Sequence, residues 1–296
     1  MTLNSGSAMT HPLSHLAPAD RHQAEFDDAV RIAIIQRDRW IDYPRAAQAR
    51  ERLNRLLATP QRERMPCMVL YGESNIGKTL IIRRFTRDHP NAFDAAAGVE
   101  RIPVLVMQMP PTPEQHRFYA ALLFELGAPF APTARLSVLE GLARGLLRRV
   151  APRLLVVDEG HHLLAGSYRE QRASLNLLKY LANDLRMCIV LVGTRDAPIA
   201  LQSDPQMSSR FVPFELPRWR ENEELRGWIK GFERILPLRR PSGLDARDVV
   251  QFVMAASHGI TGEISRLLNA AAELAILDQS ERISMSHLQH VAAHRT

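Results

Sequence analysis

One segment combines residue types at a spacing that suits phosphate binding. Gly72-Glu-Ser-Asn-Ile-Gly77-Lys78-Thr79 fits the pattern GxxxxGK(S/T), with an apolar strand predicted before it and a helix after it. Glycines let the backbone curl so that successive N–H groups point at phosphate oxygens, and the positive N-terminus of the helix strengthens the attraction. Lys78 is expected to bridge the β- and γ-phosphates, and the Thr79 hydroxyl to bind Mg²⁺. The segment predicts nucleotide binding, with ATP and Mg²⁺ as cofactors.

A chance match to this pattern is the alternative, and two observations argue against it. At average residue frequencies, a chain of this length matches about once in a hundred cases. Only three of the 38 basic residues are lysines, and Lys78 stands where the motif requires one. The residues expected to contact the nucleotide are Gly72, Glu73, Ser74, Asn75, Ile76, Gly77, Lys78, Thr79 and Leu80.

A second segment supplies acids for a metal ion and for catalysis. Leu154-Leu-Val-Val-Asp158-Glu159 is an apolar run that ends in two carboxylates. Asp158 is expected to hold the metal ion through water, so Thr79 and Asp158 form the predicted metal site, and Glu159 is expected to polarise the attacking water. A pair of acids suits hydrolysis, whereas a lone Asp would suit a switch. Acids that merely cap a buried strand are the structural alternative.

Two adjacent histidines, His161 and His162, follow these acids. Neighbouring histidines do not easily face one metal ion, and no Cys, Asp or Glu stands at a typical zinc spacing. We therefore expect them to be surface residues or residues close to the site, not ligands.

Apolar runs alternate with helical patterns over residues 66–217, which predicts an α/β fold with a parallel sheet covered by helices on both faces. Strands are expected at 68–71, 103–107, 153–157, 188–192 and 211–215. Residues 218–296 carry only helical patterns and predict a small helical lid. Residues 1–19 are expected to be a flexible leader, and residues 20–65 a helical N-terminal segment.

Composition excludes several classes of protein. Among 296 residues, 46% are hydrophobic and 24% charged, the balance of a globular domain and not of a disordered or fibrous chain. The apolar runs are too short to span a membrane, and the start lacks a signal-peptide pattern. Cys67 and Cys188 lie inside strand-like runs, which fits a reducing, cytoplasmic environment. The net charge of +6 is spread thinly and is weak evidence for nucleic-acid binding.

Because the phosphate loop and the paired acids occur in this order along the chain, the chain resembles an AAA+ ATPase. The resemblance places a polar sensor at Thr194, after the fourth strand. Gln206-Met-Ser-Ser-Arg210-Phe is similar to the box whose arginine enters the neighbouring subunit's site. Gly262-Glu-Ile-Ser-Arg266 resembles the second sensor, although its spacing is one residue longer than the usual Gly-x-x-Arg. The resemblance thus assigns catalytic roles to Lys78, Glu159, Thr194, Arg210 and Arg266.

Within that superfamily, the chain from about residue 20 to its end resembles the TniB group, relatives of TnsC and of the phage Mu B protein. The resemblance rests on three segments: Trp40-Ile-Asp-Tyr-Pro44, the residues Glu-Ser-Asn-Ile between the two glycines of the phosphate loop, and Asp158-Glu-Gly-His-His162. It implies an ATP-hydrolysing regulator of DNA transposition that assembles as a homo-oligomer, in rings or filaments, on duplex DNA without reading its sequence. A DDE transposase is the implied partner, and a TniQ-like target selector is a further one.

In relatives, DNA contacts follow the second strand, here Gln108-Met-Pro-Pro-Thr112-Pro-Glu-Gln-His-Arg117. The candidate DNA-binding residues are Arg101, Thr112 and Arg117, and an ordinary strand-to-helix connection is the alternative. Trp40 and Tyr43 could line the adenine pocket, as in relatives, or pack in a core.

Two rival functions remain open at this stage. One is an ATP-gated scaffold without DNA contact, like the ExeA-type secretion ATPases, which usually carry a membrane span. The other is a helper ATPase of the replication-initiator or helicase-loader kind, which a winged-helix domain after the lid would favour.

Overall fold

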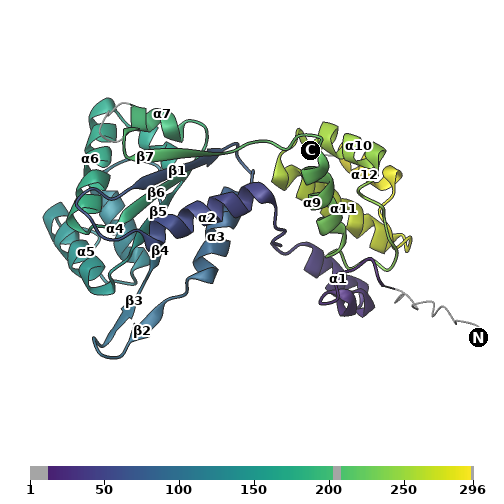
Figure 1. Cartoon of the computed structure of the whole chain (residues 1–296), viewed down its shortest axis with the longest axis horizontal. Helices are drawn as coiled ribbons and strands as arrows, with labels where there is room; N and C mark the ends of the chain where they lie inside the picture. Colours follow the sequence, from purple (N-terminus) through teal and green to yellow (C-terminus); the bar gives the residue numbers. More distant parts are fainter. Residues whose placement is uncertain (1–12, 203–207, 295–296) are drawn as a thin grey trace, which may run out of the picture. The chain divides into compact units, whose positions relative to one another are not determined.

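The computed structural model describes residues 13–202 and 208–294, which form two compact units (Figure 1). The sheet unit is Pro44–Pro217, and the helical unit combines the chain up to Tyr43 with the chain from Arg218. The predicted helical segment 20–65 is thus divided between the two units after Tyr43. Residues 1–12 of the predicted leader lie outside the described residues, whereas Leu16 is buried in the helical unit, where the Ala17 N–H donates to the carbonyl of Arg234.

The sheet unit contains a five-stranded, wholly parallel sheet in the order β4-β5-β6-β1-β7. The five strands coincide with the five apolar runs, so the predicted parallel α/β sheet is confirmed. They are β1 (Cys67–Gly72), β4 (Val104–Gln108), β5 (Leu154–Asp158), β6 (Cys188–Gly193) and β7 (Phe211–Leu216).

Alternate strand residues face opposite sides of the sheet, and both sides are covered. Val69 and Val157 belong to the core under α4, α5 and α6, whereas Leu70 and Val156 are buried outside that core. On the other face α3 packs against β1 and β6, and α2 packs against α3 and β7 (Figure 1). The helices and short helical turns of this unit are α2 (Pro44–Ala58), α3 (Lys78–Asp88), α4 (Gln115–Glu125), α5 (Leu136–Val150), η2 (Gly160–Leu164), α6 (Tyr168–Asp184) and α7 (Ala197–Gln202).

A short antiparallel hairpin connects α3 to β4, and the sequence patterns do not predict it. Its strands β2 (Ala92–Asp94) and β3 (Val99–Arg101) have three residues each, too few to show a periodicity. The Arg101 guanidinium lies 3.0 Å from Oδ2 of Asp94 on the partner strand and donates to the carbonyl of Arg149. These contacts hold the base of the hairpin against the end of α5.

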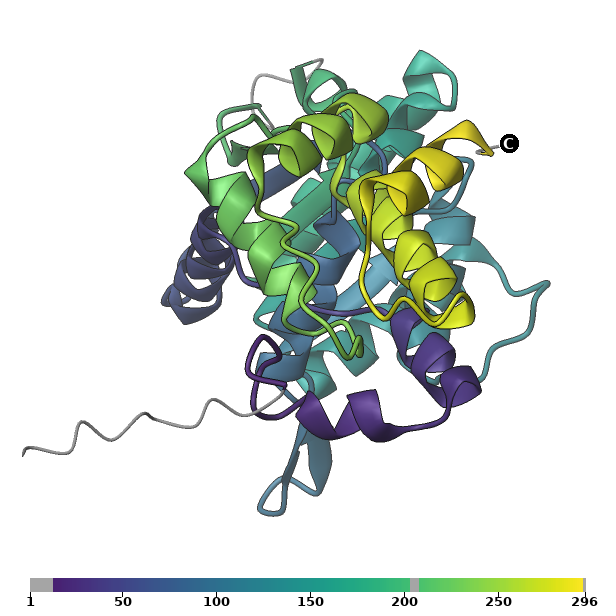
Figure 2. The ribbon, with the colours of Figure 1, turned by 90° about the vertical axis from the view of Figure 1, so that its right-hand side faces the viewer.

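The helices of the helical unit lie together (Figure 2). The unit packs around its own apolar core. A buried ion pair ties its N-terminal and C-terminal parts together, because Arg31 donates to both carboxylate oxygens of Glu281. Its elements are η1 (Arg21–Glu25), α1 (Asp28–Ile35), α9 (Glu223–Glu233), α10 (Arg247–Ser257), α11 (Thr261–Leu277) and α12 (Met285–Ala293). In both units, none of the described helices has the length and apolar content needed to cross a membrane.

Candidate nucleotide site

The phosphate loop leaves the carboxyl end of β1 and leads directly into α3. Gly72 is required by packing, because a Cβ there would lie 2.4 Å from the carbonyl oxygen of Leu216 on β7. Gly77 has φ of +100° and Asn75 a φ of +63°, so the loop makes two left-handed bends before the helix begins at Lys78. This backbone exposes the first N–H groups of α3 at the loop's centre, an arrangement suited to an anion.

The Lys78 ammonium bonds back to the backbone of its own loop. Its Nζ donates to the carbonyl oxygens of Gly72, at 3.0 Å, and of Glu73, at 2.7 Å. Burial lowers the pKa of the Lys78 ammonium, although the carboxylates of Asp158, Glu159 and Glu73 oppose this shift. Two neutral carbonyls therefore hold the Lys78 ammonium at the middle of the loop. Hydrogen bonds to charged phosphate oxygens are stronger than those to carbonyls, so a bound phosphate can replace them.

Thr79, near the start of α3, and Asp158, at the end of β5, come together. The Thr79 hydroxyl donates to Oδ2 of Asp158 at 2.9 Å, and Oδ1 of Asp158 accepts from the N–H of Glu159 at 2.8 Å. Neighbouring oxygens around an octahedral Mg²⁺ lie about 3.0 Å apart, given metal–oxygen distances of about 2.1 Å. The pair is a hard oxygen donor set, and its geometry fits the predicted magnesium site.

Glu159 adopts a left-handed backbone conformation, with φ of +55°. Such a conformation costs a non-glycine residue of the order of 1 kcal/mol and is concentrated at functional sites. It marks the sharp turn between β5 and η2 and leaves the side chain 39% exposed beside the phosphate loop's metal-site residues. A water molecule can therefore reach this carboxylate.

Thr194 follows β6, the strand between β5 and β1, so it lies at the same edge of the sheet as the phosphate loop. Its hydroxyl donates to Asp196 at 3.3 Å. Sequence reasoning missed the next residue, Arg195, whose guanidinium lies 3.4 Å from the carboxylate of Glu73 and 3.5 Å from that of Glu215. A basic residue directly after the sensor strand is the signal that could have found it.

Arg210 lies at the end of the sheet where the strands begin. Its carbonyl oxygen accepts from the N–H of Cys67, the first residue of β1, whereas the phosphate loop follows the last residue of β1. At about 3.3 Å per residue, the strand separates the two by roughly 17 Å. The guanidinium donates to Asn183 at 2.7 Å, and its Nε is buried without a hydrogen-bond partner. Gln206 and Met207 of the same box lie outside the described residues.

The remaining candidates lie in the helical unit. Arg266 is 64% exposed on α11 and forms an ion pair at 2.9 Å with Glu263, one turn earlier. Tyr43 packs against the helical core, with its ring 4.9 Å from that of Trp219, and the Trp40 indole donates to Asp42. For Tyr43, these contacts correspond to the core-packing alternative.

The three candidate DNA contacts differ in their surroundings. Arg101 is engaged by Asp94 and by the carbonyl of Arg149. Thr112 is exposed in the connection after β4, and Arg117 is exposed on α4, 3.4 Å from Glu114. The latter two lie on one continuous stretch, 108–117, whose residue Met109 donates its N–H to the carbonyl of Asp158.

A comparison with known protein families identifies the family of this chain. The family described as "Bacterial TniB protein" matches residues 31–221, which include the phosphate loop, both carboxylates and Arg210. The chain belongs to the TniB family. No protein of curated function matches this TniB-family sequence.

Solved structures similar to the TniB-family chain are AAA+ ATPases. The ORC2 protein of Aeropyrum pernix, solved as ADPNP–ADP complexes, has a TM-score of 0.62 at 17% identity, covering 88% of this chain and 71% of that one. The ORC1 protein of the same organism, in complex with DNA, has a TM-score of 0.62 at 19% identity, covering 88% and 68%. Drosophila ORC bound to DNA has a TM-score of 0.55 at 18% identity, covering 98% and 67%. At such identities the likeness concerns the fold, and this TniB-family chain has the AAA+ P-loop fold with a helical C-terminal part.

Proposed function

We propose that this protein hydrolyses ATP in a Mg²⁺-dependent reaction and uses the nucleotide state to control its assembly on duplex DNA during transposition. The observation that carries the proposal is the meeting of Thr79 and Asp158 at 2.9 Å, beside the lysine-closed phosphate loop. In this proposal the arrangement would supply a phosphate cradle, a hard-metal site and a solvent-accessible carboxylate at one sheet edge.

Each residue at this edge has a distinct task. Lys78 would leave the carbonyls of its own loop for the β- and γ-phosphates, and the first N–H groups of α3 would hold the phosphate oxygens. Thr79 and Asp158 would hold Mg²⁺, which when bound neutralises developing charge on the phosphates. The Glu159 carboxylate would accept a proton from the attacking water, and Thr194 would orient that water or the terminal phosphate.

The position of Arg210 supports the proposed assembly. Because Arg210 lies about one strand length from the phosphate loop of its own chain, it would complete the site of a neighbouring subunit. Hydrolysis would then require an oligomer, a ring or a filament, and the nucleotide would stabilise the subunit contact by mass action. Arg266 would act as the second sensor.

DNA binding and the partners are supported by relationship and by chemistry. The family is TniB, and two of the similar structures are described as bound to DNA. We propose that the chain holds duplex DNA through its phosphates, with Thr112 and Arg117 as contacts and Arg101 a weaker candidate because Asp94 engages it. A DDE transposase and a TniQ-like selector would be the partners, in the cytoplasm.

The deciding experiment is fluorescence anisotropy of a random-sequence duplex, measured with ATP, with ADP and without nucleotide. We expect strong binding with ATP alone, a steep loss of affinity with added salt, and no ATP-dependent binding by Lys78→Ala. Equal or absent DNA binding in all three states would contradict the DNA switch. An ATP-gated protein scaffold without DNA contact would then explain the same nucleotide site better.

A further inference from the structure

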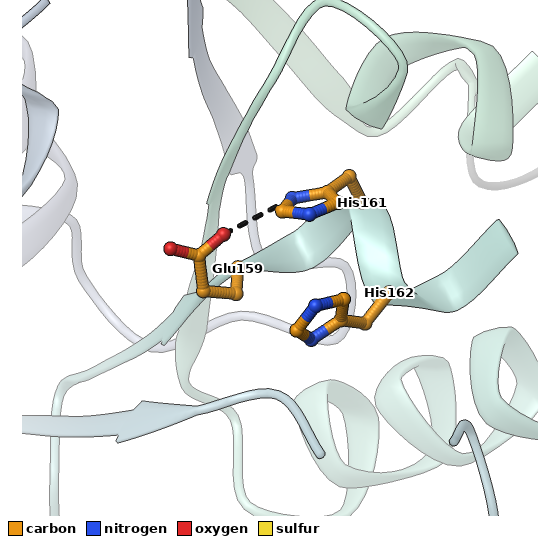
Figure 3. A group of neighbouring side chains, drawn as sticks. All are labelled: Glu159, His161 and His162. Carbon is orange, nitrogen blue, oxygen red and sulfur yellow. Dashed lines mark ion pairs between the residues drawn. The ribbon is translucent and has the colours of Figure 1, made fainter. Parts of the chain in front are cut away.

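Three potential metal ligands gather where β5 turns into η2. Glu159, His161 and His162 each offer a ligand atom, and these atoms lie within 4.8 Å of one another. Figure 3 shows the Glu159 carboxylate pointing toward the His161 ring, with the His162 ring beside them. The short 3-10 turn that begins at Gly160 brings the two neighbouring histidine rings to a centroid distance of 4.5 Å. We expected that adjacent histidines would not easily face one ion, yet this turn brings a ligand atom of each within 4.8 Å of the other.

His162 is oriented as a metal ligand usually is. Its Nδ1 lies 3.0 Å from the carbonyl oxygen of Met109. A carbonyl can only accept, so Nδ1 carries the proton and Nε2 keeps its lone pair. Metal-binding histidines commonly donate their second ring N–H to a backbone carbonyl, which fixes the ring and its tautomer.

His161 and Glu159 have the separation of two ligands of one ion. Nδ1 of His161 lies 3.1 Å from Oε2 of Glu159, and Nδ1 is buried without a hydrogen-bond partner. Two ligands of a tetrahedral Zn²⁺ lie about 3.3 Å apart, given metal–ligand distances of about 2.0 Å. An ion between the two groups would satisfy the buried nitrogen, and a small rotation of the side chains would bring the third ligand into reach.

We propose that Glu159, His161 and His162 bind one borderline transition-metal ion of the Zn²⁺ class, at a site separate from the Mg²⁺ pair Thr79 and Asp158. Imidazole nitrogens favour such ions, whereas Mg²⁺ prefers oxygen ligands, so the two sites discriminate by donor type. The bound ion takes the Glu159 carboxylate away from water activation. It therefore stops hydrolysis and leaves ATP bound, a consequence that rests on the proposed ATPase function.

Metal binding is tested on nucleotide-free, full-length protein, so the result does not depend on hydrolysis. Zn²⁺ affinity is measured by competition with a chromophoric chelator, and Co²⁺ binding by its visible absorption. We expect one ion per chain, with affinity reduced roughly 10- to 100-fold or more in His161→Ala and in Glu159→Gln. His290→Ala is the matched control, since it removes a histidine that stacks on His294 at 4.2 Å on α12. Thermal melting confirms that each variant is folded.

The consequence for hydrolysis is measured separately, with Zn²⁺ held at a buffered free concentration in excess Mg²⁺ and ATP. Wild type should lose hydrolysis and keep its affinity for a fluorescent ATP analogue, and His161→Ala should resist the inhibition. Equal Zn²⁺ affinity in wild type and His161→Ala, or loss of the ion in His290→Ala, would overturn the metal site. Displacement of nucleotide by Zn²⁺ would overturn the inhibitory role. A wild-type protein that binds the ion and never hydrolyses ATP would refute the proposed ATPase and the inhibitory role, and leave the metal site standing.

Discussion

The Thr79 hydroxyl donates a 2.9 Å hydrogen bond to Oδ2 of Asp158, a residue 79 positions later in the chain. Asp158 ends β5, and Thr79 lies at the start of α3, which follows β1; β6 lies between these two strands, so the contact is made beyond the carboxyl ends of the strands and not within one ladder. It places the hydroxyl at the end of the phosphate loop beside the carboxylate at the end of β5, as the proposed Mg²⁺ site requires. The predictions for the site start from this contact.

Lys78→Ala should weaken ATP binding by roughly 30- to 150-fold, because a charge-assisted contact of about 2–3 kcal/mol is lost. The measurement is titration with a fluorescent ATP analogue. Lys230→Ala is the matched control, since Lys230 is exposed and pairs with Asp245 at 3.1 Å in the helical unit. Equal affinity in the two variants would remove Lys78 from the phosphate site.

Glu159→Gln should bind ATP with unchanged affinity and hydrolyse it about 10²- to 10⁴-fold more slowly, because the amide cannot accept the proton of water. Phosphate release under saturating ATP measures the rate. The variant should also trap the DNA-bound oligomer in the anisotropy assay. Rapid turnover by Glu159→Gln would show that another group activates the water.

Arg210→Ala should bind ATP normally and lose about 10³-fold in hydrolysis, because under the proposed function the Arg210 guanidinium completes a neighbouring subunit's site. Mixing Arg210→Ala with Lys78→Ala should restore part of the activity, since one variant has an intact loop and the other an intact arginine. Arg64→Ala, which removes an exposed guanidinium that donates to Ser209, is the control. If the mixture stays inactive while each variant still oligomerises, action between subunits is excluded.

Glu281→Gln should destabilise the helical unit by about 3–5 kcal/mol, because it breaks the buried pair with Arg31. Burial opposes ionisation of Glu281, yet hydrogen bonds from Arg31 and the N–H of Arg239 outweigh it and hold the pKa below its ordinary 4.5. The stabilisation is therefore complete above about pH 4.5 and is lost as the pH falls through the folded pKa. Urea unfolding between pH 3 and 7 measures it.

The exposed pair Arg266–Glu263 is the reference for that measurement. Arg266→Ala should cost about 1 kcal/mol or less, since solvent screens this contact. A Glu281→Gln variant as stable as Arg266→Ala across the whole pH range would contradict the role of the buried pair.

Both thiols should be inert in the folded protein. Cys67 and Cys188 are free and buried, and burial raises the pKa of Cys67 to about 11 and that of Cys188 to about 12. At pH 8 the thiolate fraction is about one part in a thousand or less, against roughly a quarter for an unfolded cysteine. A chromogenic disulfide reagent should therefore react at least about 100-fold faster in denaturant. Fast modification of either thiol in the native protein would contradict this.

The phosphate loop at 72–79 and the acids at 158–159 were predictable because each is a contiguous pattern between elements that the apolar runs define. The same runs predicted the parallel sheet, since a strand buried on both faces must be apolar throughout. The hairpin β2–β3 escaped prediction because three-residue strands carry no periodicity. Arg195 escaped because its partners, Glu73 and Glu215, are distant in sequence.

Local spacing and backbone freedom define the phosphate loop, so the residue pattern along the chain is enough to identify the residues that could bind a nucleotide. Which distant groups meet depends on the folded structure. Strand order brings Asp158 to Thr79, and strand direction places Arg210 at the far edge from its own loop. The turn after β5 gathers Glu159, His161 and His162. Such meetings depend on how strands pair and turn in three dimensions, and residue spacing along the chain does not encode them directly.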